Sequence, residues 1–370
     1  MIIGVPKEIK NHEYRVGMTP NGIKVFIKNG HEVLIEKGAG LGSGFADEEY
    51  EAAGAKIVSS NKEVYSKAEM IYKIKEPLEP EYELLKEGQV VFTYFHFASD
   101  EKLTKAMLDR RIVAIAYETI ETEDGRLPLL EPMSEIAGQM ASILGAYYLA
   151  KPQGGRGVLA GGVPGVEPAE FVILGGGTVG LNAAKIAAGI GAHVTILQRS
   201  EARMRYLKDV LPPNVDVVKF NEANLAEALK KADVVVGAVL VPGAKAPKFV
   251  TRDMLKLMKK GSVIVDVAID QGGVFETSKP TFHSDPVYEV DGIIHYCVAN
   301  MPGAYPRTST LAITNTTLPY ALEIANKGWR KALKENPALR KGLNMAFGKV
   351  TNKGVAEAFN LEYHPPESVL

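Results

Sequence analysis

Short apolar runs alternate with segments of helical periodicity along the first third of the chain. The segment 100–108, for example, has the spacing of an amphipathic helix. Strands that are apolar on both faces are typical of a parallel sheet covered by helices on both sides, so this pattern predicts an α/β domain ending near Pro128. The strands that we expect here are 2–5, 31–35, 68–74, 90–94 and 112–116.

A long helix and a glycine-rich segment follow this domain. Apolar residues recur at helical spacing from 132 to 151, and Ser134 is a candidate N-cap. Ten of the residues from 154 to 180 are glycine. The part from 154 to 168 is compatible with a flexible linker or with an ordered loop or hairpin, and its glycine content alone does not decide between them.

A second series of strands and helices begins at Phe171 and matches a doubly wound, Rossmann-type sheet. The chain turns helical again at about 308–326, and the segments after it are too short for a third core. We therefore expect the tail to pack on the first domain, which gives a substrate domain of 1–128 with 306–370, an inserted nucleotide domain of 129–305, and a cleft between them. The expected strands of the inserted domain are 171–174, 193–197, 215–218, 234–238, 263–267 and 293–296.

The first turn of the second domain carries a dinucleotide-binding fingerprint. Gly175, Gly177 and Gly180 form G-x-G-x-x-G between an apolar strand and a helix, which is the context that makes the motif diagnostic. The first glycine allows the tight turn, the second lets the main chain approach a pyrophosphate, and the third lets helix and strand pack closely. The N-terminus of the helix then offers N–H groups to the phosphates.

The residue that would meet the adenosine ribose departs from the usual pattern. The second strand of such a fold commonly ends in Asp or Glu, which binds the ribose 2′-hydroxyl, but this strand is followed by Gln198. An amide can accept a hydrogen bond, yet it does not repel a 2′-phosphate. Arg199, Arg203 and Arg205 lie on a solvated helix face, or else Arg199 or Arg203 allows NADP to compete. We predict NAD binding with weakened discrimination against NADP.

Composition narrows the functional classes. The chain has 370 residues, of which 46% are hydrophobic and 24% charged, and its formal net charge is -1. This balance predicts neither a nucleic-acid-binding nor a membrane-binding surface. The single cysteine, Cys297, excludes an intrachain disulfide, and the first residues lack a signal-peptide pattern. We expect a cytoplasmic protein.

Polar residues at strand ends are the candidates for chemistry. Ligands of open parallel sheets bind beyond the carboxyl ends of the strands, and a cleft between two such domains would gather residues from both. Each candidate has a simpler interpretation: an isolated Arg or Lys is usually a surface charge, and a His in an aromatic run is more often packed. Asp266 is compatible with a structural role, but spacing alone does not select Asp270 over it. The candidates are Arg15, Lys73, Lys75, His96 and Asp270.

Ten motifs spread nearly end to end carry a family resemblance. They are VPKE (5–8), RV (15–16), KIKEP (73–77), TYFH (93–96), YET (117–119), PMSE (132–135), GGVPGV (161–166), GAVLVPG (237–243), DVAIDQGG (266–273) and VANMPGA (298–304). Together they resemble the NAD-dependent bacterial alanine dehydrogenases. The N-terminal part of proton-translocating transhydrogenase shares the fold and several of these motifs.

The resemblance implies an activity and residue roles. The expected reaction is reversible oxidation of L-alanine to pyruvate and ammonium, with hydride passing to NAD and water adding to the iminium. Arg15 and Lys75 would bind substrate, His96 would be the acid/base, and Asp270 the second catalytic residue. Contacts with the cofactor would come from Ser134, Thr178, Val179, Arg203, Val239, Leu240, Val267, Ala268, Ile269, Asp270, Lys279, Val298, Ala299, Asn300 and Met301, besides the glycines and Gln198.

The chain departs from the family at two further points. Lys279 stands where Arg is common, and Lys327 replaces the His that joins Glu323 in the magnesium-binding pair of some members, so we predict no metal there. Members are commonly hexamers, which would make residues 154–168 an ordered assembly hairpin in a homohexamer.

Two other functions compete with a dehydrogenase. A transhydrogenase subunit would need a membrane-spanning partner and would have no need for His96, and a third possibility is an inactive NAD sensor. Tolerance of other small amino acids, the direction of the reaction, the number of subunits and the extent of domain closure are not predicted by the sequence.

Overall fold

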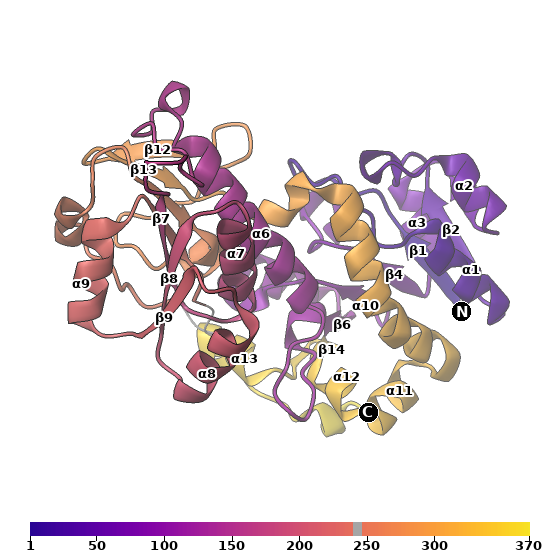
Figure 1. The fold of residues 1–370 in the computed structure, drawn as a ribbon. Coiled ribbons are helices and arrows are strands. Elements are labelled where there is room, and N and C mark those ends of the chain that lie inside the picture. The colour runs from indigo at the N-terminus through magenta and orange to yellow at the C-terminus, as the bar shows by residue number, and fades with distance from the viewer. Residues whose placement is uncertain (240–245) are drawn as a thin grey trace. The chain divides into compact units, whose positions relative to one another are not determined.

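The computed structural model describes residues 1–239 and 246–370, which fold as two compact units. Unit 1 contains residues 1–133 and 303–370, and unit 2 contains residues 134–302. The chain thus leaves unit 1, builds unit 2 and returns, as the colours of Figure 1 trace. No helix of the described residues is long and apolar enough to cross a membrane.

Unit 1 is built on an eight-stranded sheet with the order β15-β14-β6-β5-β4-β1-β2-β3. The six strands from the N-terminal part are parallel, whereas β14 and β15 run antiparallel to their neighbours. The tail therefore does pack on the first unit, but it does so with two strands that the sequence did not predict. The strands are β1 (Ile2–Val5), β2 (Glu32–Glu36), β3 (Lys56–Val58), β4 (Met70–Tyr72), β5 (Val90–Thr93), β6 (Val113–Ala116), β14 (Leu343–Ala346) and β15 (Lys349–Val350).

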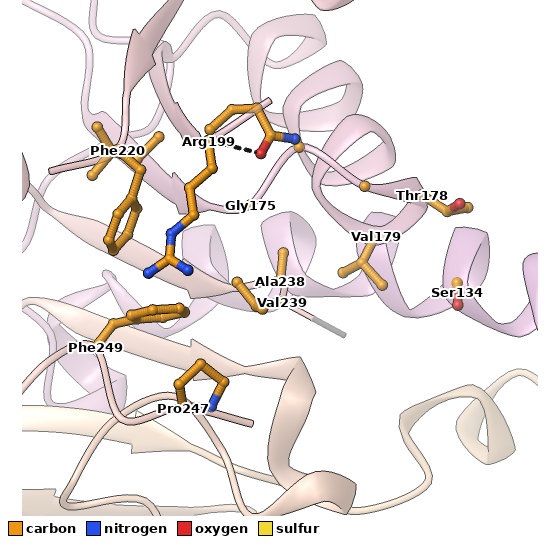
Figure 2. A pocket seen from close by; sticks show the side chains of 14 residues that line it. Ser134, Gly175, Thr178, Val179, Arg199, Phe220, Ala238, Val239, Pro247 and Phe249 are labelled. Carbon is orange, nitrogen blue, oxygen red and sulfur yellow. Dashed lines mark hydrogen bonds between the residues drawn. The ribbon is translucent and has the colours of Figure 1, made fainter. Parts of the chain in front are cut away.

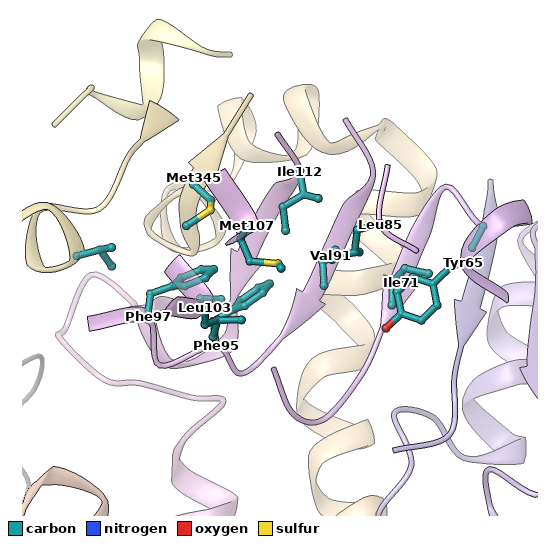
Figure 3. Close-up of a cluster of buried hydrophobic side chains, with 14 of the residues drawn as sticks. Tyr65, Ile71, Leu85, Val91, Phe95, Phe97, Leu103, Met107, Ile112 and Met345 are labelled. Atoms are coloured by element: carbon teal, nitrogen blue, oxygen red, sulfur yellow. The ribbon is translucent and has the colours of Figure 1, made fainter. Parts of the chain in front are cut away.

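Helices cover this sheet and complete its core. Thr19 caps α1, because its side chain accepts a hydrogen bond from the main-chain N–H of Gly22. An apolar cluster that includes Phe97, Met107 and Met345 joins α5, β14 and the loop after β5 (Figure 3). The helices are α1 (Pro20–Lys28), α2 (Asp47–Ala52), α3 (Asn61–Lys67), α4 (Glu79–Tyr82), α5 (Glu101–Asp109), α10 (Pro306–Lys327), α11 (Trp329–Glu335), α12 (Pro337–Lys341) and α13 (Lys353–Phe359).

Unit 2 is a Rossmann fold. Its sheet order is β12-β13-β11-β10-β7-β8-β9, and every pair is parallel except β12 with β13. All six predicted strands are present, and β12 is an addition. Asp291 and Gly292 form the two-residue turn between β12 and β13 with φ values of 54° and 83°, a conformation typical of Asp-Gly hairpins. The strands are β7 (Glu170–Leu174), β8 (His193–Gln198), β9 (Val215–Lys219), β10 (Val234–Gly237), β11 (Val263–Asp266), β12 (Val287–Val290) and β13 (Ile293–Tyr296).

The start of α6 and the glycine-rich segment 154–168 can now be compared with the predictions for them. The helix α6 begins at Glu131, so Ser134 lies within its first turn and is not its N-cap. Residues 154–168 are an ordered hairpin, because Val163 and Val166 exchange main-chain hydrogen bonds. The helices are α6 (Glu131–Tyr148), α7 (Thr178–Gly189), α8 (Glu201–Val210) and α9 (Glu222–Lys231).

Candidate functional site

The turn from β7 to α7 has the geometry of a pyrophosphate cradle. Gly175 lies in the left-handed region at φ 97°. A Cβ atom at Gly180 would lie 1.9 Å from the carbonyl oxygen of Gly175, so only glycine fits at this close approach of helix and strand. A Cβ at Gly177 would meet nothing within 4 Å, which leaves open space directly above the N-terminus of α7. These are the properties that a bound phosphate group requires.

A cavity of about 430 Å³ opens over this turn (Figure 2). Its volume lies within the range of small-molecule sites, about 300–1,000 Å³. Seven predicted cofactor residues line it, namely Ser134, Gly175, Gly177, Thr178, Val179, Gln198 and Val239. Gly176, Leu197, Arg199, Phe220, Ala238, Pro247 and Phe249 complete the lining. The cavity therefore lies where the fingerprint predicts that a dinucleotide binds.

The ribose side of this cavity offers donors rather than a carboxylate. The side-chain oxygen of Gln198 accepts the main-chain N–H of Arg199 at 2.6 Å and that of Ser200 at 3.4 Å. It is thus engaged in the turn after β8, whereas the fingerprint predicts that it accepts from the ribose. None of the described residues that line the cavity is Asp or Glu, so no negative side chain among them would repel a 2′-phosphate.

The three arginines near Gln198 have different environments. The Arg199 guanidinium lies between the rings of Phe220 and Phe249, at 5.1 and 5.0 Å from their centroids (Figure 2). Arg203 donates from Nε to the carbonyl of Gly176 at 2.7 Å and does not line the cavity. Arg205 is exposed on α8. Of these three arginines, Arg199 is the one that lines the cavity.

Two further groups of predicted cofactor residues follow strands of the same sheet but do not line this cavity. Val267, Ala268, Ile269 and Asp270 form a 3-10 helix directly after β11. Residues 298–301 follow β13, and Lys279 places its ammonium 4.4 Å over the ring of Tyr288. Leu240 lies outside the described residues.

The structure separates the two aspartates that spacing alone did not. Asp266 is fully buried and accepts hydrogen bonds from the main chain of Val274 and from the Ser278 hydroxyl, which holds the loop after β11. Burial raises the pKa of Asp266. Asp270 is exposed at the end of the 3-10 helix. Asp266 has the structural environment, and Asp270 is the aspartate that a ligand can reach.

In unit 1, the candidate substrate residues follow neighbouring strands. Arg15 lies in the loop after β1, Lys75 follows β4 and His96 follows β5, and these three strands are adjacent in the sheet. The switch point of the strand order lies between β1 and β4, where ligands of such sheets bind. The topology thus gathers these three residues at one edge.

Arg15 is not the surface charge that an isolated arginine usually is, because only 2% of its area is exposed. Glu13 accepts from Nε at 2.7 Å and from Nη2 at 2.5 Å, and this fork fixes the plane of the guanidinium. Burial disfavours the charge, but Glu13 outweighs burial and raises the pKa of Arg15. A fixed, charged guanidinium suits recognition of a carboxylate.

The two lysines of the KIKEP motif lie beyond β4, which ends at Tyr72, so the predicted strand over 68–74 is too long at its C-terminal end. Lys73 is fully buried, with its ammonium 2.8 Å from Glu81 and 3.2 Å from Glu8. These carboxylates raise the pKa of Lys73 despite its burial, and burial raises the pKa of Glu8 to about 7. Lys73 is therefore structural, and the partly exposed Lys75 is the lysine that a substrate can reach.

His96 is exposed, which argues against the packing interpretation. Its ring lies parallel to that of Tyr94, with a centroid distance of 5.8 Å. Tyr94 is buried and donates its hydroxyl to the carbonyl of Leu129. Burial raises the pKa of Tyr94, and the charge of Arg15 opposes this increase.

Several functional features were missed from the sequence. The carboxylates of Glu8, Glu13 and Glu118 each hold a segment that carries Lys75, Arg15 or His96. Glu118 could have been found, since it follows an apolar strand directly, as His96 does. The Phe220–Phe249 pair around Arg199 has no sequence signal.

Metal-binding residues do not gather among the described parts of the chain: no group of three or more His, Cys, Asp or Glu side chains could hold an ion there. Glu323 forms an ion pair with Lys327 at 2.8 Å and accepts from the amide of Asn336. The lysine ammonium thus occupies the position beside Glu323 that a cation would need.

Comparison with known proteins follows the same division of the chain. Residues 4–137 match the N-terminal domain, and residues 141–353 the C-terminal domain, of the family described as alanine dehydrogenase/PNT. The chain is 61% identical to an alanine dehydrogenase of Methanococcus maripaludis, over all of both chains. A solved L-alanine dehydrogenase superposes with a TM-score of 0.94 at 49% identity, over 97% of this chain and 99% of its own. A solved transhydrogenase from Sinorhizobium meliloti superposes with a TM-score of 0.80 at 25% identity, over 95% of this chain and 99% of its own.

Proposed function

The chain belongs to the alanine dehydrogenase/PNT family, and from this premise we propose that it catalyses the reversible, NAD-dependent oxidative deamination of L-alanine. It is an oxidoreductase acting on the CH–NH2 group of an amino acid. The proposed reaction converts L-alanine, NAD⁺ and water into pyruvate, ammonium, NADH and a proton. The observation that carries the proposal is that an open dinucleotide cradle and the Arg15, Lys75 and His96 set occur in one chain.

The side chains of unit 1 divide the work on the substrate. Arg15, held by Glu13, binds the carboxylate of alanine through charge-assisted hydrogen bonds. Lys75 stabilises negative charge on the oxygen that becomes the pyruvate carbonyl. His96 removes and returns protons as water adds and ammonia leaves, because the ordinary pKa of histidine lies near neutral pH.

The residues of unit 2 hold the cofactor. Gly175 and Gly177 bind its pyrophosphate. The other residues that line the cavity, among them Ser134 and Val239, bind the remainder of the cofactor. A bound nicotinamide would supply the acceptor for the hydride that leaves the alanine Cα. We propose that Asp270 assists the proton transfers beside it, and that Lys279, Val267, Ile269 and the segment 298–301 complete the site. The family implies a nicotinamide cofactor, and we propose NAD.

The second candidate function is a nucleotide-binding subunit of a transhydrogenase, which the Sinorhizobium meliloti likeness favours. One pair of assays separates the two. An alanine dehydrogenase forms equal amounts of NADH and pyruvate from L-alanine and NAD. A transhydrogenase subunit instead exchanges hydride between NADH and NADP analogues and leaves alanine unchanged.

Arg199 is expected to make NADP a usable second cofactor. Arg199→Ala should lower kcat/KM with NADP about 10- to 100-fold, the worth of a charged hydrogen bond to the 2′-phosphate, and should change kcat/KM with NAD far less. Gln198→Asp should likewise lower kcat/KM with NADP far more than kcat/KM with NAD, since a carboxylate repels the 2′-phosphate. Steady-state kinetics with both cofactors measure this, and the exposed Arg205→Ala is the matched control. A wild-type preference for NAD above roughly a thousandfold would contradict the prediction.

We propose that the hairpin 154–168 forms the contact of a homohexamer. Its side chains Leu159, Val163 and Val166 are 68%, 55% and 63% exposed, an apolar set that association would cover. Val166→Asp should therefore reduce the mass measured by sedimentation velocity, because a charge would be buried in the contact. Val210→Asp, at an exposed valine on α8, is the control and should leave the mass unchanged. A monomeric wild type would contradict the assembly.

The state of the single cysteine, Cys297, bears on the cellular compartment of the protein. Cys297 is the single cysteine, it is buried, and burial raises its pKa to about 11, so it is a packed thiol without thiolate chemistry. This usage supports a reducing compartment, which we propose is the cytoplasm.

A further inference from the structure

The carboxylate of Glu118 is directed at the main chain that carries His96. One oxygen accepts the N–H of His96 at 2.6 Å. The N–H of Phe95 is shared between both oxygens, at 3.2 Å each. Two successive main-chain donors thus converge on one anionic side chain, which is a strong, charge-assisted arrangement.

The fold dictates this meeting. Strands β5 and β6 are parallel neighbours, with Thr93 opposite Ala116 at their carboxyl ends. The chain continues from Thr93 to Phe95 and His96, and from Ala116 into the 3-10 helix Tyr117–Thr119 that carries Glu118. Both segments therefore emerge at the same edge of the sheet, two or three residues beyond paired positions.

His96 needs such support because its backbone is in the left-handed region, at φ 53° and ψ 39°. Residues other than glycine adopt this region rarely and at a cost in free energy. The carbonyl of His96 accepts from the Ser99 hydroxyl at 2.8 Å and from the Ser99 N–H at 3.0 Å. Ser99 thus holds the residue on its C-terminal side, and Glu118 holds it on its N-terminal side.

The hydrogen bonds that Glu118 accepts come from the main chain of Phe95 and His96. A surface carboxylate of no consequence would remain solvated. Glu118 is half-buried, and its two carboxylate oxygens accept hydrogen bonds from two N–H groups. These bonds fix both the carboxylate and the main chain at Phe95 and His96.

We infer that Glu118 is a positioning residue, which fixes the left-handed backbone of His96 and thereby the placement of the imidazole against the substrate. The inference rests on the proposed role of His96 as acid/base. A small displacement of an acid/base group costs rate rather than substrate affinity, because the group acts in the proton-transfer steps.

The first test is a double-mutant cycle. Glu118→Ala should lower kcat for NADH formation roughly 10- to 100-fold with little change in KM for alanine. Glu118→Gln should lose less, because one amide oxygen still accepts. In the His96→Ala background, neither substitution should lower kcat further, since the group that Glu118 positions is absent. Equal losses in both backgrounds would overturn the inference.

The second test does not depend on activity. Hydrogen exchange of the peptide that contains residues 94–99 should be faster in Glu118→Gln, with other peptides of unit 1 unchanged. Glu49→Gln is the matched control, because Glu49 caps α2 through the N–H of Ala46 and should leave this peptide and kcat unaltered. Unchanged exchange at 94–99 would overturn the role of Glu118. A wild type that forms no NADH from alanine would instead overturn the proposed function, and the exchange measurement would still judge Glu118.

Discussion

His96→Ala is expected to lower kcat for NADH formation from L-alanine by about 10²- to 10⁴-fold, the usual contribution of a general acid/base. The imidazole is exposed at the carboxyl edge of the sheet, beside the buried Tyr94. Its removal deprives the water-addition and ammonia-release steps of their proton carrier. Because no packed core is disturbed, the unfolding temperature and the affinity for NADH should stay close to those of the wild type.

His31→Ala is the control for this variant. His31 precedes β2, at the opposite edge of the same sheet, where it meets Asn326. Its loss should leave kcat within about twofold of the wild type, as for a surface substitution. If His96→Ala retained full activity, the assignment of His96 as the acid/base would be wrong even if the chain oxidised alanine.

Gly180→Ala is expected to damage unit 2 severely, because the added methyl group has no space. Its Cβ would lie 1.9 Å from the carbonyl oxygen of Gly175, a contact that only movement of α7 away from β7 can relieve. We expect a loss of about 3 kcal/mol or more in the free energy of unfolding, with loss of NADH binding. Denaturant unfolding and the fluorescence of bound NADH measure the two effects.

Substitutions at two other glycines of this region distinguish an effect on packing from an effect on cofactor binding. Gly189→Ala, later in α7, meets nothing within 4 Å and should be neutral or stabilise by up to about 1 kcal/mol. Gly177→Ala also meets no protein atom, at φ -69°, so it should fold normally and yet weaken NADH binding where the pyrophosphate needs the space. Unimpaired binding in Gly177→Ala would contradict the seat that we assign to the phosphates.

Most of the parallel strands could be predicted because they read as apolar runs. The short parallel edge strand β3, which is partly exposed, and the antiparallel strands β12, β14 and β15 were not predicted. The half-exposed β12 alternates weakly, and β14 contains Asn344, whose amide is satisfied by Thr119 and by the carbonyl of Gly342. A partner such as Thr119 lies far away in the sequence and leaves no local pattern.

Some features of the candidate site could likewise be predicted from the sequence, whereas others could not. Gly175 and Gly180 could be predicted because the close approach of the main chain dictates their type. The burial of Lys73 could not, because it depends on Glu8, which lies 65 residues earlier, and on Glu81. Gln198 was identified from its position, whereas the use of its oxygen within its own turn required the structure.

The central claim is that hydride passes from the Cα of alanine to the nicotinamide, and isotope transfer tests it most directly. The chain should be incubated with NAD and L-alanine deuterated at Cα, and the NADH analysed by mass spectrometry. We predict that the NADH carries one deuterium per molecule and that pyruvate appears in equal amount. NADH without deuterium, or pyruvate without NADH, would contradict the account.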